Sequence, residues 1–161
     1  MSGSNDARFE DGVDRPLRLA AEDADDLEVI STLIQDAVFP ASEMRWDKKA
    51  RRFGVLINRF RWEDHDRAQH AERGFERVQS VLAFDDVKAV QSQGIQRGDA
   101  DMVHALLSVI WEKGQDGSGR IVLTLAGDGA VALEAECLNV TLQDVTRPYL
   151  APSGKAPHHP D

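Results

Sequence analysis

The densest group of potential metal ligands in this sequence lies between residues 63 and 72. Two histidines, His65 and His70, are interspersed there with the acidic residues Glu63, Asp64, Asp66 and Glu72. Imidazole and carboxylate groups suit a divalent cation. The spacing, however, matches neither a His-Glu-x-x-His motif nor a calcium-binding loop, and neighbouring arginines compete for the carboxylates. We therefore favour a solvated charged loop, and a metal-dependent enzyme or metal-binding protein that uses His65 and His70 is an alternative.

Other potentially reactive side chains have simpler structural explanations. His104 is a potential general base, but its apolar surroundings favour a histidine at the edge of the core with one hydrogen-bonded nitrogen. Cys137 ends an apolar alternation with Leu133 and Ala135, which favours a thiol that acts as a small hydrophobic side chain. Two histidines at 158–159 lie in a proline-rich terminus. The sequence thus predicts no catalytic residue and no cofactor.

Positive charge is concentrated in residues 43–62, which hold seven basic and two acidic residues, while the whole chain has a net charge of -9. Aromatic side chains are interleaved with these cations, as in proteins that stack and neutralise single-stranded nucleic acid. The alternative is that the aromatic side chains face the core and that the cations pair with the acidic helix or with a second subunit. The candidate binding residues are Arg45, Arg52, Arg59, Arg61 and Trp62.

Length and composition favour a cytoplasmic protein with one β-rich domain at 16–146, between a flexible tail at 1–15 and a proline-rich tail at 147–161. The acidic balance argues against general binding to nucleic acid or to an anionic membrane surface. A single cysteine fits a reducing compartment. These features favour a non-enzymatic binding or assembly module that forms a homo-oligomer or binds a protein partner.

The elements that must position these residues are mainly strands. One amphipathic helix is expected from Asp23 to Pro40, because its apolar residues recur at helical spacing after a capping aspartate. From Met44 onward the alternation has a period of two, and a change of face indicates either a bulge near Asn58 or a strand covered on both sides. Asp85-Asp86 is a turn candidate from which the run Val87 to Ile95 returns, and GQDGSG at 114–119 predicts a hairpin loop. Residues 102–112 fit a strand or a helix, and we prefer a strand. The predicted fold is α+β, mainly antiparallel β: a seven- to eight-stranded sandwich or partly open barrel, with the N-terminal helix packed on it.

Short phrases along the chain also resemble a known family. They include Arg59-Phe60-Arg61-Trp62-Glu63 and the run from Gln91 to Ile95, QSQGI. In these phrases the chain is similar to an uncharacterised alphaproteobacterial family, catalogued as domain of unknown function 2948. The resemblance covers about residues 16–160 and implies a bacterial, cytoplasmic setting. It carries no assigned activity and no catalytic residue.

Overall fold

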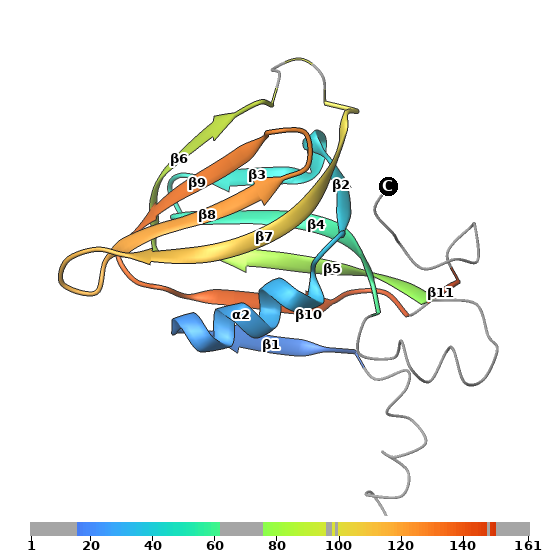
Figure 1. Ribbon diagram of the computed structural model, residues 1–161, viewed down its shortest axis with the longest axis horizontal. Coiled ribbons are helices and arrows are strands. Elements are labelled where there is room, and N and C mark those ends of the chain that lie inside the picture. The colour runs from blue at the N-terminus through green and yellow to red at the C-terminus, as the bar shows by residue number, and fades with distance from the viewer. Residues whose placement is uncertain (1–15, 62–75, 96–97, 99, 148, 151–161) are drawn as a thin grey trace, which may run out of the picture.

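The computed structural model describes residues 16–61, 76–95, 98, 100–147 and 149–150. Within them the chain forms one α-helix, one short 3-10 helix and eleven strands (Figure 1). In chain order these are β1 (Arg18–Ala21), α2 (Ala24–Leu33), β2 (Val38–Pro40), η1 (Ala41–Glu43), β3 (Met44–Asp47), β4 (Arg52–Phe60), β5 (Glu76–Phe84), β6 (Val87–Gln93), β7 (Val103–Lys113), β8 (Gly119–Leu125), β9 (Ala130–Ala135), β10 (Val140–Asp144) and β11 (Tyr149–Leu150).

All strand pairs are antiparallel, and the strand order is β1-β10-β5-β4-β2-β7-β8-β9-β6, with β3 beside β4 and β11 beside β5. The sheet curls over its apolar face but stays open, and α2 lies along its inner side beside β1 and β7 (Figure 1). This confirms the predicted mainly antiparallel α+β class. The described residues form eleven strands and not the predicted seven or eight; β2 and β11, with three and two residues, are too short to show alternation and account for part of this difference.

The helix begins where the sequence predicts but ends earlier. The Asp23 side chain accepts a hydrogen bond from the Asp26 backbone N–H at 2.8 Å, so the predicted cap is confirmed. The helix then ends at Leu33, well before Pro40. Asp36 adopts a left-handed conformation with φ of 66°, and its N–H donates to the Leu106 carbonyl oxygen at 2.9 Å. The prediction of a longer helix was therefore wrong, because the chain leaves the helix to pair with β7.

Strand β4 contains no bulge. Its register with β5 runs without a shift from Phe53 to Phe60, so the bulge was the wrong one of the two interpretations. The last two residues of β4, Arg59 and Phe60, and the following Arg61 are all buried, which agrees with the other interpretation, a strand covered on both sides.

The turn at Asp85 and Asp86 forms as predicted, with Asp86 at φ of 61°. Strand β6 does not, however, return beside β5 as the sequence suggests. It pairs with β9 in another part of the sheet. The physical reason is that both sides of β5 are already occupied, by β4 on one side and by β10 on the other.

Residues 103–113 form a strand, which confirms our preference for a strand over a helix in this region. β7 pairs with β2 near its start and with β8 along the rest of its length, with a register shift between Leu106 and Ser108. β7 packs against α2, whose Leu27, Ile30 and following Ile34 are at most 1% exposed. Its far half therefore has β8 on one side and the helix on the other.

Candidate ligand-binding groove

The arginines predicted from the sequence do not form one exposed site. Arg59 is completely buried, and its guanidinium donates to the Asp144 carboxylate from Nε and Nη2 at 3.0–3.2 Å. The same carboxylate accepts from Ser80 Oγ at 2.6 Å and from the Leu17 N–H at 2.9 Å. Arg59 thus joins β4, β5 and β10 through the core, where a ligand phosphate has no access to it.

The other candidate arginines are separated from one another. Arg61 is 5% exposed and pairs with Glu76 at 2.9 Å, while Arg52 lies near the surface and pairs with Asp85 at 2.8 Å. The hydrogen bond to Asp85 raises the pKa of Arg52 above its ordinary value. Arg45 is exposed and donates to neighbouring backbone carbonyls. Arg52, Arg59 and Arg61 thus pair with carboxylates of neighbouring strands and turns, and none of these three carboxylates belongs to the acidic helix, which was one of the two partners suggested by the sequence.

Three of the predicted site residues, Trp62, His65 and His70, lie outside the described residues. Within the described ranges no group of three or more histidine, cysteine or carboxylate side chains could hold a metal ion. The predicted metal site therefore stays a prediction. The aromatic side chains of the basic segment that are described, Phe53, Phe60 and Trp46, belong to the core or pack against it.

His104 has the position at the core predicted for it, whereas Cys137 differs from expectation. His104 is 7% exposed, its ring contacts Phe39, and its Nε2 has no hydrogen-bond partner among the described residues. Cys137 is exposed, so the prediction of a buried apolar thiol was wrong: β9 ends at Ala135 and the following residues bend outward. Its thiol donates to Asp86 Oδ2 at 3.3 Å, and this hydrogen bond, with some desolvation, raises the pKa of Cys137.

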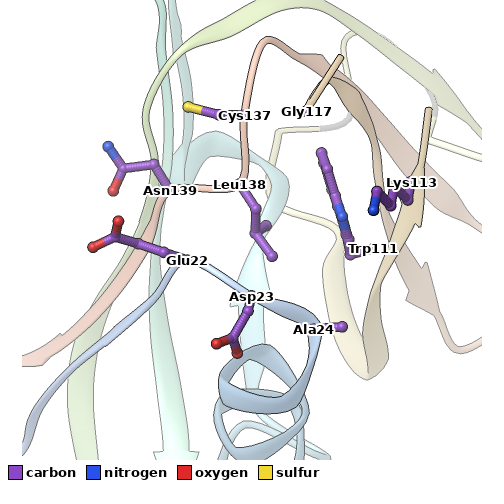
Figure 2. A pocket seen from close by; sticks show the side chains of 9 residues that line it. All are labelled: Glu22, Asp23, Ala24, Trp111, Lys113, Gly117, Cys137, Leu138 and Asn139. Atoms are coloured by element: carbon purple, nitrogen blue, oxygen red, sulfur yellow. The ribbon is translucent and has the colours of Figure 1, made fainter. Parts of the chain in front are cut away.

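A large hollow lies where three connections meet at one end of the sheet. It encloses about 650 Å³ between the start of α2, the β7–β8 hairpin and the β9–β10 connection. Figure 2 shows Trp111 and Lys113 on one side, with Leu138 projecting toward the centre. The lining residues are Glu22, Asp23, Ala24, Trp111, Lys113, Gly117, Cys137, Leu138 and Asn139.

Trp111 is held in place by a close contact with the backbone of the neighbouring strand. A Cβ atom added at Gly119 would lie 2.6 and 2.7 Å from two carbons of the indole and 2.5 Å from the Glu112 carbonyl oxygen. Only a residue without a side chain leaves room for the ring there. Gly119 therefore allows the indole to lie over β8 as a wall of the hollow.

A second hollow of about 350 Å³ continues along β7 and shares Ala24 and Trp111 with the first. Its walls are Leu27, Glu28 and Ser31 from α2 and Val109 and Ile110 from β7. The two hollows together form a groove between the helix and the strand, which we call the α2–β7 groove.

The backbone of β7 faces this groove. The Gly114 N–H donates to the Ser118 carbonyl oxygen at 2.7 Å and closes the β7–β8 hairpin. Hydrogen-bonded and non-hydrogen-bonded pairs alternate along an antiparallel ladder. Counting back from this pair, Lys113, Trp111 and Val109 occupy non-hydrogen-bonded positions in the register with β8. Their backbone N–H and C=O groups therefore point away from β8.

A contact on α2 agrees with this orientation. The Val109 N–H donates to Ser31 Oγ at 2.9 Å, so it does point toward the helix. No described residue pairs with the backbone groups of Trp111 or Lys113 on the same side. The strand thus presents an open edge to the part of the groove that the larger hollow occupies.

The helix side of the groove carries unneutralised negative charge. Glu22, Asp23 and Glu28 line the groove, and Asp25 and Asp26 lie beside them in the chain. All five are exposed, and none of them forms an ion pair with another described residue. Helix α2 contains no basic residue. The opposite wall, formed by β7, contributes one ammonium group, that of Lys113.

Fold and groove together define an α+β protein built on an open antiparallel sheet, with an acidic groove between its helix and a strand edge. The chain belongs to the family described as "Protein of unknown function (DUF2948)", which matches residues 17–159, and the resemblance noted in the sequence is thereby confirmed. No curated protein and no solved structure matches the chain. Among the described helices, none is long and apolar enough to cross a membrane.

Proposed function

We propose that this protein is a non-enzymatic binding module whose ligand occupies the α2–β7 groove. The observation that carries the proposal is the Trp111 indole, which lies over Gly119 and walls a hollow of about 650 Å³. Ligand sites typically enclose about 300–1,000 Å³ and combine apolar walls with a few polar groups. Tryptophan beside a hollow is also the side chain that most often dominates the energy of an interface.

The chemistry of the groove supports binding more than catalysis. Cys137, the single cysteine of the chain, lines the larger hollow. The hydrogen bond from its thiol to Asp86 raises the pKa of Cys137 and so stabilises the protonated, unreactive form. In Figure 2 its sulfur points away from Trp111. The Asp23 carboxylate is engaged as the helix cap. These groups are suited to shape and charge recognition.

A fragment screen on the isotope-labelled protein tests the proposal. We expect weakly binding small molecules to cluster in the groove and to shift the resonances of the Trp111 indole N–H, Gly117 and Leu138. Trp111→Ala should abolish these shifts, whereas the matched control Val145→Ala, at a half-exposed apolar side chain that lines neither hollow, should leave them unchanged. Fragments that bind only elsewhere, for example on the β3–β4 hairpin, would show that the ligand site is not this groove.

The other two functions predicted from the sequence keep their own tests. Metal binding through His65 and His70 predicts stoichiometric metal in protein purified without a histidine tag. Binding of single-stranded nucleic acid through the basic hairpin predicts retention on a filter that strengthens at low salt. The burial of Arg59 and Arg61 weakens the hypothesis of nucleic-acid binding, because phosphate contacts need accessible cations.

A further inference from the structure

We infer that the ligand of the groove is an extended, basic peptide segment of another protein, which adds a strand to the open edge of β7. This inference rests on the proposed function and specifies the ligand class. Peptides commonly bind in this way to an exposed sheet edge, where backbone hydrogen bonds supply affinity and pockets for alternate side chains supply specificity.

The first reason is the unsatisfied backbone of β7. Trp111 and Lys113 direct four N–H and C=O groups into the groove, whereas the neighbouring Val109 is covered by the helix and its N–H is bound to Ser31. A row of such groups is a template for another strand. From Trp111 to Lys113 the open edge extends about 7 Å at the usual rise per residue, which pairs with about three residues of an added strand.

The second reason is the position of the larger hollow relative to that edge. Side chains of an added strand alternate between two directions, so every second one enters the space between Trp111 and Leu138. Figure 2 shows this space with Ala24 at its base, and the small side chain of Ala24 leaves the helix end open to the strand. One long side chain of the peptide fills it.

The third reason is charge. Three exposed carboxylates line the groove at the start of α2, at Glu22, Asp23 and Glu28, and the exposed Asp25 and Asp26 lie next to them in the chain. None of the five has an ion-pair partner among the described residues. A peptide that carries arginine or lysine next to its inserted side chain complements this wall, whereas an acidic peptide is repelled. The aromatic face of Trp111 also attracts a cation placed over it.

Selection from a phage-displayed library of random dodecapeptides, followed by titration of the enriched peptides in synthetic form, tests the inference. We expect the enriched sequences to combine β-branched residues with arginine or lysine and to bind more weakly as salt increases. Failure to enrich any sequence, or enrichment of acidic sequences, would overturn the inference. Fragments that still bound the groove would leave the more general proposal standing.

Two variants at one position separate backbone pairing from side-chain contact. Lys113→Pro removes an N–H that points away from β8, so the β7–β8 ladder stays intact. We expect it to weaken peptide binding about tenfold, the effect of one lost hydrogen bond at a desolvated edge. The matched control, Lys113→Ala, removes a like charge and should leave binding of a basic peptide unchanged or stronger. Equal affinity for both variants would show that the peptide does not pair with the edge.

Amide hydrogen exchange on the wild-type protein keeps the test valid even if the proline variant unfolds. Binding of an enriched peptide should slow exchange at Trp111 and Lys113 and leave Glu112, whose amide already faces β8, nearly unchanged. Unchanged exchange at both edge amides would refute strand addition. Protection of the same amides without peptide, at concentrations where the protein dimerises, would show that a second copy of the chain occupies the edge instead.

Discussion

Replacement of Arg59 by methionine removes the positive partner of a carboxylate that is shielded from water. The side chains of Arg59 and Asp144 are 0% and 4% exposed, and three N–H···O contacts of 3.0–3.2 Å join them. In the Arg59→Met variant Asp144 keeps the hydrogen bonds from Ser80 Oγ and the Leu17 N–H but loses its counter-charge. Breaking a buried ion pair on one side costs about 3–5 kcal/mol, a large part of the roughly 5–15 kcal/mol that stabilises a folded domain.

Urea unfolding followed by circular dichroism at neutral pH measures this loss by linear extrapolation. The matched control is Arg52→Met, because the Arg52–Asp85 pair is exposed and an exposed pair contributes at most about 1 kcal/mol. The double variant Arg59→Met/Asp144→Asn removes both charges and keeps an acceptor for the Leu17 N–H. We expect it to be more stable than Arg59→Met alone. Two results would refute this reasoning: a decrease in the free energy of unfolding below about 1 kcal/mol for Arg59→Met, or a double variant that is no more stable than Arg59→Met. Either would show that the two charges do not stabilise each other in a site shielded from water.

Three further predictions concern the groove and its surroundings. Gly119→Ala should destabilise the fold by about 1–3 kcal/mol and shift the fluorescence of the adjacent indole, whereas Gly54→Ala, with its nearest neighbour at 3.8 Å, should change both little. Asp86→Asn should lower the pKa of Cys137 and move its alkylation profile with iodoacetamide to lower pH, and an unchanged profile would contradict the assigned cause. His104→Leu removes a buried nitrogen without a described partner and should raise the urea midpoint by an amount equivalent to about 1–3 kcal/mol; an unchanged or lower midpoint would show that this nitrogen does not destabilise the fold.

Local chemistry made several elements predictable from the sequence. The helix start followed from Asp23 and the apolar spacing after it, and the strand character of 103–113 followed from two-residue alternation. Tight turns at Asp86 and Asp128 form where aspartate and glycine tolerate positive φ. The fold class was correct because each of these signals depends on neighbours in the sequence.

Strand partners were less predictable. Alternation assigns the faces of a strand, but it does not determine which edge a strand meets. The prediction that β6 returns beside β5 was wrong because β10, from much later in the chain, already occupies that edge. The helix end was misplaced for a similar reason, since a hydrogen bond from Asp36 to β7 ends it before Pro40 does.

The groove was not predicted at all. The available signals were a tryptophan at the end of a long strand and a glycine-rich hairpin after it, and both were interpreted as ordinary features of a β-hairpin. Their significance depends on Leu138 and on the start of α2, which are distant in sequence from Trp111 and adjacent to it only in the folded chain. Conversely, the basic segment looked like a surface, but pairing with Asp144 and Glu76 places two of its arginines inside.

The sequence by itself determined the types of element, the faces of the strands and the acidic character of residues 22–28, because these depend on side-chain periodicity and composition. Only the tertiary structure decided which strand edge remained open, which cations were neutralised and that Trp111 lines a hollow. Those outcomes depend on which distant segments compete for the same backbone groups and the same charges, and no local pattern records that competition.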